Sequence, residues 1–166
     1  MKTLFLILSF ILASFPSVQP DQSKSVFISE GESMAPTLSN NDQFLVDKTF
    51  YDSHSIQRGD IVIFQVEKDR QHVKRVIALP GETVEYKGDI LYINNKVVDE
   101  PYLTSAKNVA KKENLYLTED FGPITIPEDT IFVLGDNRLN SLDSRVFGPV
   151  HVNQILGKMT NKLPSN

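Results

Sequence analysis

The sequence predicts a mainly β protein with an antiparallel sheet or partly open barrel as its core, an inserted small β meander and one N-terminal apolar helix. Short runs rich in β-branched and aromatic residues recur along the chain, and polar turns separate them. Two of these turns carry glycine or paired asparagines at spacings that suit tight hairpins. A single long apolar run stands at the start, within residues 4–18.

The apolar run follows Lys2 and stays uncharged until Asp21, which leaves two interpretations open. Its length fits the core of a signal peptide, whereas a membrane-spanning helix normally needs about 20 apolar residues. Neither Ala13-Ser14-Phe15 nor Ser17-Val18-Gln19 ends on the small residue that a cleavage site needs. We therefore favour a retained membrane anchor at residues 1–18 over a signal-like segment. The early lysine predicts a cytoplasmic N-terminus.

In the first half of the chain after this run, the residue pattern predicts short strands. Residues 19–28 are expected to form a linker, although its last three residues are of β type. Strands are predicted at residues 44–46, 61–64 and 73–77. Leu79-Pro80-Gly81-Glu82 then has proline and glycine at the two central positions of a type II turn.

Three shorter strands after this turn predict the meander, at residues 83–86, 90–93 and 96–98. The polar segment 102–121 has no clear period and is expected to be a surface loop with some helix. Strands at 131–134 and 154–158 return the chain to the main sheet. We assign the core to residues 29–80 and 129–166, and an inserted hairpin and loop subdomain to residues 81–128.

Composition excludes several classes of function. The net charge of −4 provides no basic surface for nucleic acid. The absence of cysteine excludes disulfides, thiolate zinc sites and a thiol nucleophile. His54 and His151 match no metal-ligand spacing. We therefore expect no nucleic acid, no metal and no cofactor.

One serine stands at a position that suits a nucleophile. Ser33 follows a short β-type run and precedes a Met-x-Pro turn. Pro36 disfavours a helical Ala35, so no helix can begin at the serine, and Gly31 permits an unusual backbone angle two residues earlier. The hydroxyl would then lie at a stiff corner near backbone N–H groups. Most serines in such turns only satisfy local hydrogen bonds, so this motif alone leaves both interpretations open.

Two further segments carry polar side chains of matching chemistry. Lys74 interrupts the apolar strand 73–77. Ser141, Asp143 and Arg145 are spaced by two, so in an extended segment they would project from one face. The aspartate and arginine could then form a bidentate pair. The alternative is an exposed face with a solvated lysine and a surface ion pair worth under about 1 kcal/mol.

Three motifs occur in a characteristic order. They are Ser33-Met34-x-Pro36-Thr37-Leu38; Lys74-Arg75-Val76-Ile77 with Leu79-Pro80-Gly81-Glu82; and Gly135-Asp136-Asn137-Arg138 with Ser141-x-Asp143-Ser144-Arg145. In this order and spacing they resemble the bacterial type I signal peptidases, in the short Gram-positive form with a single anchor. The resemblance covers the chain from about Phe27 to Lys158.

The resemblance implies a membrane-bound serine endopeptidase with acyl-enzyme chemistry. Ser33 would be the nucleophile and Lys74 the general base. Ser141 would hydrogen-bond the Lys74 amine and orient it. Asp143 and Arg145 would form a salt bridge that shapes the site.

The sequence departs from some relatives around the nucleophile. The resemblance implies an oxyanion hole made by the Ser33 N–H and a group at Gly31, where some relatives carry a serine hydroxyl. Glycine has none, which leaves a backbone N–H or a water as the second donor. Glu32 would impair the base if it pointed inward, and would be harmless if it pointed outward. His72 stands where many relatives have an aromatic or aliphatic side chain, and we expect it at the solvent-exposed rim of the pocket.

A lysine base must lose its proton near neutral pH. Its pKa starts near 10.4, and burial against apolar side chains lowers the pKa by disfavouring the charge. Lowering it to near neutrality costs about 4 kcal/mol, which the β core would have to supply. Arginine at position 74 would stay protonated and could not replace the lysine.

The resemblance also implies the substrate and the location. Signal peptides of secreted preproteins would be cut after small residues one and three positions before the scissile bond, with the peptide added to a sheet edge. We expect a monomer bound to the lipid bilayer of the plasma membrane, single-pass, with an extracellular catalytic domain. Two alternatives remain: an impaired homologue that only binds preproteins, and a self-cleaving Ser/Lys regulator, although no DNA-binding module is evident.

Overall fold

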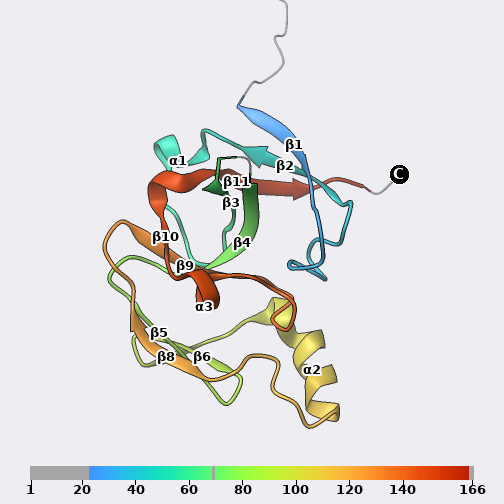
Figure 1. The fold of residues 1–166 in the computed structure, drawn as a ribbon, viewed down its shortest axis with the longest axis vertical. Coiled ribbons are helices and arrows are strands. Elements are labelled where there is room, and N and C mark those ends of the chain that lie inside the picture. The colour runs from blue at the N-terminus through green and yellow to red at the C-terminus, as the bar shows by residue number, and fades with distance from the viewer. Residues whose placement is uncertain (1–22, 69, 165–166) are drawn as a thin grey trace, which may run out of the picture.

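The computed structural model describes residues 23–68 and 70–164. They form eleven strands in two antiparallel sheets, three α-helices and two 3-10 helices, η1 and η2. Figure 1 shows the larger sheet above the smaller one, with α2 beside the smaller sheet. The predicted mainly β, antiparallel class is confirmed. The apolar helix predicted at residues 1–18 lies outside the described residues, and no helix within them is long and apolar enough to cross a membrane.

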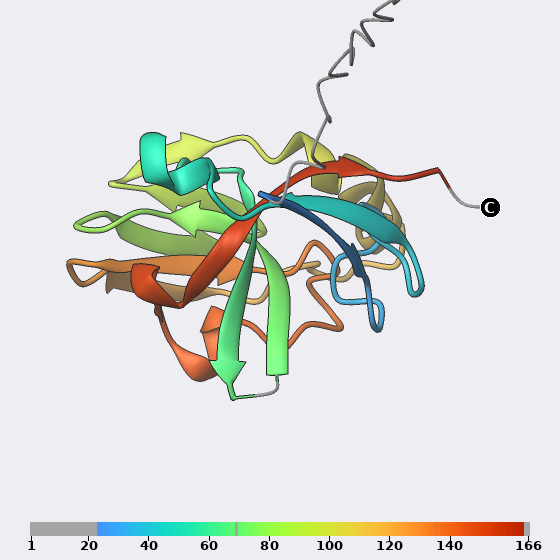
Figure 2. The same ribbon diagram turned by 90° about the horizontal axis from the view of Figure 1, so that it is seen from above.

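The main sheet has seven strands, and each neighbouring pair is antiparallel. Its spatial order is β1 (Lys24–Ile28), β2 (Gln43–Asp47), β11 (Ile155–Lys162), β3 (Ile61–Glu67), β4 (Arg70–Ala78), β9 (Thr130–Leu134) and β10 (Val150–His151). The C-terminal strand β11 therefore lies inside the sheet, between β2 and β3 (Figure 2). Because β1 and β10 each have one partner, the sheet is open and no closed barrel forms among the described residues.

The first strand begins within the segment that the sequence assigns to a linker. Residues 24–28 form β1, which pairs along its whole length with β2. Burial alternates along β1: Ser25 and Phe27 are half-buried, while Val26 and Ile28 are exposed. Phe27 stacks on Phe44 of β2, with ring centroids 6.0 Å apart. This contact explains why a segment with a polar start still joins the sheet.

The smaller sheet lies within the segment 81–128, in the order β7 (Lys96–Val98), β6 (Ile90–Ile93), β5 (Thr83–Lys87) and β8 (Phe121–Thr125). The turn that leads into it has the predicted form: Gly81 has a φ of 75°, and the Glu82 N–H donates to the Leu79 carbonyl at 3.1 Å. The sequence did not indicate β8, because Gly122 and Pro123 weaken a strand pattern. Proline is tolerated here since β8 is an edge strand.

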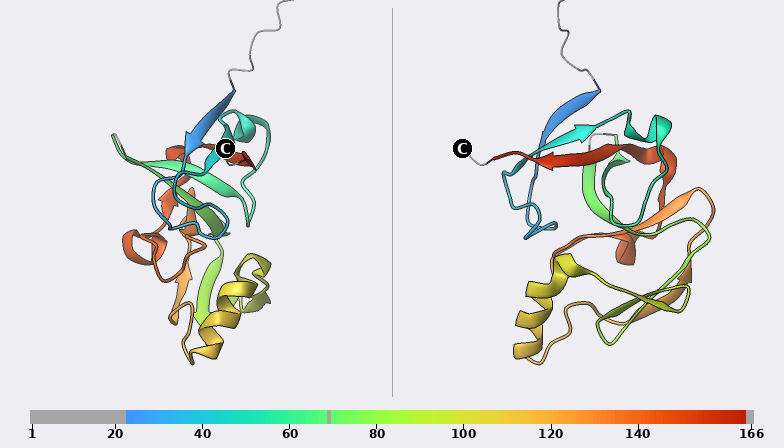
Figure 3. Two further views of the ribbon diagram at one scale, coloured as in Figure 1. Left: turned by 90° about the vertical axis from the view of Figure 1, so that its right-hand side faces the viewer. Right: turned by 180° about the vertical axis from the view of Figure 1, so that it is seen from behind.

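The helices are short. α2 (Thr104–Lys112) follows η1 (Pro101–Leu103) within the segment expected to be a loop with some helix. α1 (Phe50–Ser53) and α3 (Ser144–Phe147) each make one turn, and η2 (Val152–Gln154) precedes β11. Figure 3 shows α2 at the side of the smaller sheet in both views.

Four apolar clusters pack the described elements together, and three of them include residues of the main sheet. One joins the two sheets, and its members include Ile77, Phe132, Leu134, Val84, Tyr86 and Leu91. The second lies on β3, β4 and β9, around Val62, Val76 and Val133. The third joins Met34 and Leu38 to Phe44, Val46 and Ile63. Each large buried side chain contributes about 1.5–3 kcal/mol, so the last cluster fixes the turn at residues 33–38 against the main sheet.

Candidate active site

Ser33 lies in a compact turn between β1 and β2. The Ala35 N–H donates to the Glu32 carbonyl at 3.1 Å, and the Leu38 N–H donates to the Met34 carbonyl at 2.9 Å. Met34 and Leu38 are fully buried. The turn is therefore anchored on both sides of its exposed corner, and the half-buried Ser33 is held there as the sequence predicts.

The amine of Lys74 reaches this turn from the middle of β4. Its Nζ donates to the Ser33 Oγ at 2.8 Å and to the Val73 carbonyl at 3.0 Å. Lys74 is only 3% exposed, and its amine is in contact with the turn of Ser33. The alternative of a solvated surface lysine is therefore excluded.

Burial lowers the pKa of Lys74 to about 8, and the carboxylates of Asp143 and Asp136 oppose this by raising it. Removal from water disfavours the ammonium form more than these two carboxylates stabilise it. A substantial neutral fraction therefore exists near physiological pH. A neutral amine with a hydroxyl at hydrogen-bond distance can accept the hydroxyl proton.

Asp143 and Arg145 form the predicted bidentate pair, with Nε to Oδ1 and Nη2 to Oδ2 distances of 2.8 Å each. The pair does not arise from an extended segment, one of the two possibilities that the sequence left open, because Asp143 caps the one-turn helix α3 that contains Arg145. The Asp143 carboxylate also accepts the Gly135 N–H at 3.0 Å. Its pKa is lowered below the usual range, because these hydrogen bonds and the charge of Arg145 outweigh the effect of burial.

Ser141 lies near the nucleophile, but it makes no hydrogen bond to Lys74. Its Oγ is buried and makes no hydrogen bond of good geometry among the described residues, although its hydroxyl lies close enough to the Asp143 carboxylate to lower the pKa of that group. A side chain at Gly135 would overlap both this Oγ and the carbonyl oxygen of Ser33. The two serines therefore meet at the backbone of Gly135, where only glycine fits.

Asp136 is a site residue to which the sequence assigned no role. Its carboxylate accepts two hydrogen bonds from Arg75, at 2.8 and 2.6 Å, and one from Thr37 Oγ1 at 2.5 Å. Arg75 follows Lys74 in β4, and Thr37 belongs to the turn of Ser33. Asp136 thus connects the segments that carry the serine and the lysine. Its place in the Gly135–Arg138 motif was the only indication in the sequence.

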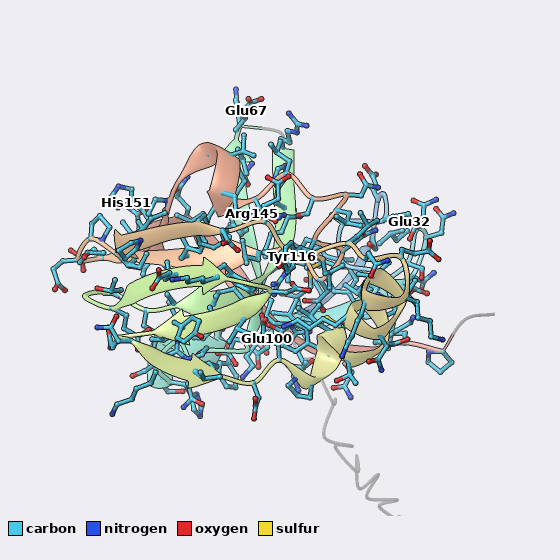
Figure 4. The ribbon with its side chains drawn as sticks, turned by 90° about the horizontal axis from the view of Figure 1, so that it is seen from below. Glu32, Glu67, Glu100, Tyr116, Arg145 and His151 are labelled. Carbon is cyan, nitrogen blue, oxygen red and sulfur yellow. The ribbon has the colours of Figure 1, made fainter. Side chains whose placement is uncertain are left out.

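The Gly31 N–H and the Glu32 side chain are both directed toward Asn40 and away from the Ser33–Lys74 pair. The Gly31 N–H donates to Asn40 Oδ1 at 2.8 Å, and Gly31 has a φ of 83°. The Glu32 carboxylate accepts the Asn40 N–H at 3.3 Å and is exposed. Figure 4 places Glu32 at the periphery of the molecule. Of the two orientations that the sequence left open, the outward one is observed.

A groove of about 230 Å³ lies beside the turn, between the end of β1 and the start of β4. Its lining residues are Phe27, Ile28, Ser29, Glu30, Phe44, Ile63, Gln71, His72 and Val73. β9 pairs with β4 only from Arg75 onward, so the earlier part of β4 has one edge without a strand partner. The open main sheet thus brings two free strand edges to the same groove.

The expectation that His72 lies at the rim in solvent is corrected. His72 is half-buried and packs against Phe64 and Phe147, with ring centroids 5.9 and 6.1 Å apart. Its Nδ1 is buried without a hydrogen-bond partner in the described part of the chain. Burial, followed by the positive charge of Lys74, lowers the pKa of His72.

Comparisons with known proteins agree on one family. The model of the family "Signal peptidase, peptidase S26" matches residues 3–163. Signal peptidase I of Bacillus caldolyticus is 49% identical over 141 residues, covering 81% of this chain and 76% of the relative. Signal peptidase I of Bacillus amyloliquefaciens is 50% identical over 133 residues, covering 79% and 69% of the two chains.

A solved structure is similar as well. The crystal structure of a signal peptidase I from Enterococcus faecalis has a TM-score of 0.60 and 44% identity, covering 64% of this chain and 98% of that one. Fold and site together define a serine endopeptidase. The chain belongs to the signal peptidase family, peptidase S26.

Proposed function

We propose that this protein removes N-terminal signal peptides from exported preproteins, with Ser33 as the nucleophile and Lys74 as the general base. The observation that carries the proposal is the 2.8 Å contact between the Lys74 amine and the Ser33 hydroxyl. The relatives named signal peptidase I support the substrate class. Ser/Lys chemistry requires no metal and no cofactor.

The reaction proceeds through an acyl-enzyme. Neutral Lys74 accepts the proton of the Ser33 hydroxyl while Oγ forms a bond to the scissile carbonyl carbon. The resulting ammonium gives this proton to the leaving amine as the C–N bond breaks, which leaves the signal peptide esterified to Ser33. Lys74 then takes a proton from a water molecule as the water attacks the ester, and it gives this proton to the departing Ser33 Oγ. The signal peptide is released as an acid, and the serine hydroxyl and the neutral amine are restored.

The developing oxyanion requires donors near Oγ. The backbone N–H of Ser33 is one, since it makes no hydrogen bond to another described residue. The Gly31 N–H is a poor second donor, because Asn40 already accepts it. A water molecule therefore remains as the candidate for the second donor.

The groove between β1 and β4 suits the signal-peptide side of the substrate. An extended peptide there would pair with the free strand edges and place alternate side chains toward the protein. The wall includes Phe27, Phe44, Ile63 and Val73, whose side chains leave little room. Small residues one and three positions before the scissile bond fit this wall, whereas large ones would clash.

Three residues support the pair without reacting. The Asp143–Arg145 pair holds the Gly135 backbone through the Asp143 carboxylate. This backbone contacts both Ser33 and Ser141. We assign to Ser141 the role of orienting the Lys74 amine once substrate is bound, because its buried hydroxyl makes no well-formed hydrogen bond in the described part of the chain.

The proposed location is the plasma membrane, with a single N-terminal anchor at residues 1–18 and a monomeric catalytic domain on the extracellular side. Support comes from the apolar run after Lys2 and from the start of β1 at Lys24, only a few residues later. A short connection keeps the site close to the bilayer, where signal peptides emerge.

The test is cleavage of a purified preprotein by the full-length chain in detergent. The wild-type protein is expected to release a product whose N-terminus follows a small residue, and Ser33→Ala is expected to release none. Binding of the preprotein without cleavage would identify the chain as a non-enzymatic homologue. Cleavage that persists in Ser33→Ala would show that another group is the nucleophile.

A further inference from the structure

A second groove, of about 440 Å³, shares no lining residue with the groove between β1 and β4. One wall is the segment that follows α2, including Leu117 and Glu119, and the other is the loop before α3, including Leu139 and Ser141. Leu139 is 69% exposed, so the groove opens to solvent on this side. The function proposed above leaves this groove without an occupant.

The second groove is connected to the turn of Ser33 through Ser141 and the Gly135 backbone. Ser141 lines it, and the buried Ser141 Oγ lies against the Gly135 backbone together with the carbonyl oxygen of Ser33. Arg145, whose partner Asp143 binds the Gly135 N–H, lines the same groove. A chain that leaves the nucleophile in this direction would therefore enter the groove directly.

We propose that this groove holds the first residues of the mature protein, which follow the scissile bond, and that its charge disfavours acidic side chains there. The inference rests on the proposed function. A substrate cut in its interior must extend on both sides of Ser33. The groove between β1 and β4 offers the free strand edges that can retain an acyl chain. Most of the residues that line the second groove lie in loops, which suits a segment that must depart.

The charge of the second groove is set by its acidic residues. Both arginines in the wall are already paired, Arg138 with Glu100 at 2.5 Å and Arg145 with Asp143 at 2.8 Å. Glu100, Arg138 and Asp143 are buried, so these pairs cannot reorient toward a ligand without breaking. Within each pair the two charges offset one another, and Glu100 is also paired, at 3.4 Å, with Lys107, which does not line the groove.

Glu119 and Asp120 are exposed in the same wall, and neither has a cationic partner in the described part of the chain. Asp120 accepts the Gly88 N–H at 2.7 Å, whereas Glu119 makes no such bond among the described residues. The groove therefore carries uncompensated negative charge. A lysine or arginine early in the mature protein would be attracted, and a glutamate or aspartate would be repelled.

The wall that presents Glu119 is held firmly. The Asp89 carboxylate accepts the N–H groups of Leu117 and Thr118 at 3.1 and 3.0 Å. Thr118 is fully buried, and its hydroxyl accepts a hydrogen bond from Arg138 at 3.2 Å. The position of Glu119 is thus fixed before substrate arrives, so little ordering is needed on binding.

The experiment compares preprotein-derived peptides that differ only at the second, third or fourth residue after the scissile bond, with lysine or glutamate there. For the wild-type full-length chain at low salt, we expect kcat/KM to favour lysine by about two- to fivefold at one or more positions. Glu119→Gln should reduce this ratio toward one, and Glu119→Lys should invert it. High salt should weaken the effect.

The matched control is Glu113→Lys, which makes the same charge change at an exposed site outside the groove and should leave the ratio unchanged. A small ester of the signal-peptide side, which has no residues after the cleaved bond, should be hydrolysed equally by all variants. Equal ratios in the wild-type protein and Glu119→Lys would overturn the inference. Failure to cleave any peptide would instead refute the proposed function.

Discussion

Asp136 binds Arg75 through both carboxylate oxygens, at 2.8 and 2.6 Å, although 61 residues separate the two in the chain. One of these oxygens also accepts the Thr37 hydroxyl. Asp136 is 1% exposed, and Arg75 stacks on the Tyr102 ring 4.0 Å away. A single buried carboxylate thus fixes β4 relative to the turn that carries the nucleophile.

Asp136→Asn should damage both stability and activity. The substitution leaves the Arg75 guanidinium without a counter-charge in a largely buried position, and loss of one partner of such a pair costs about 3–5 kcal/mol. Urea unfolding of the full-length chain measures this loss. The matched control is Asp52→Asn at an exposed position, which should change stability by less than about 0.5 kcal/mol. An Asp136→Asn protein as stable as the control would refute the connecting role.

Substitution of Lys74 should separate activity from stability. Lys74→Met removes the base, so kcat should fall by at least about a thousandfold, while the chain keeps its fold. The lowering of the Lys74 pKa from 10.5 to about 8 corresponds to a folding cost of about 3 kcal/mol at neutral pH. Lys74→Met should therefore be more stable than the wild-type protein by up to this amount, as thermal unfolding would report.

Lys74→Arg should also be inactive, because an arginine at this position stays protonated. Unlike methionine, it keeps a buried positive charge, so it should gain no stability. Retained turnover in Lys74→Arg would place the general base elsewhere.

The pH profile should follow the Lys74 amine. Only the neutral form accepts a proton, so kcat/KM should rise with pH through an apparent pKa of about 8. The Asp143 carboxylate raises this pKa, so Asp143→Asn should move the rise to lower pH even as it lowers the maximal rate. A profile that stays in place would show that Asp143 does not act on Lys74 electrostatically.

Stability should depend on pH through the same amine. Between about 8 and 10.5 the unfolded chain holds a proton on Lys74 that the folded chain has released. The free energy of unfolding should therefore rise with pH across this window. Lys74→Met should lack this contribution, which pH-dependent unfolding of the two proteins would reveal.

The sequence predicted the parts of the fold and site that depend on local patterns. The alternating and apolar runs indicated β2, β3, β4 and β9, and the order of the three motifs indicated which serine and lysine meet. β8 was not predicted, because its glycine and proline are tolerated only at an edge that the pattern does not reveal. The conformation around Asp143 stayed open, since spacing by two does not distinguish a strand from a capped turn.

Sequence patterns could not predict contacts between residues that are far apart in the chain. The hydrogen bonds of Asp136 to Thr37 and Arg75 join residues 99 and 61 positions apart, and no local pattern predicts them. The packing of His72 on Phe147 depends on where α3 lies against β4. The outward direction of Glu32 depends on Asn40, which the turn brings back beside it.

Gly135→Ala should inactivate the enzyme through packing alone. A Cβ at this position would overlap the Ser33 carbonyl oxygen and the Ser141 hydroxyl, and the backbone oxygen has no rotamer by which to move away. The nucleophile turn must therefore shift. A displacement of about 1 Å can cost a hundredfold in rate, whereas such overpacking costs about 1–3 kcal/mol in stability. We expect a folded protein with kcat lowered by about a hundredfold or more and its KM little changed.

Gly88→Ala is the matched control for Gly135→Ala. Gly88 has a φ of 58° and open space around the added methyl group, and it lies in the β5–β6 turn. A left-handed alanine costs about 1–2 kcal/mol, so this variant should lose comparable stability while keeping its kcat. Because Ser141→Ala removes only the overlap with Oγ and leaves those with the Ser33 carbonyl oxygen and the Cβ of residue 141, the double variant Gly135→Ala/Ser141→Ala should remain impaired. Full recovery in the double variant would show that the methyl group acts on Ser141 and leaves the Ser33 turn in place.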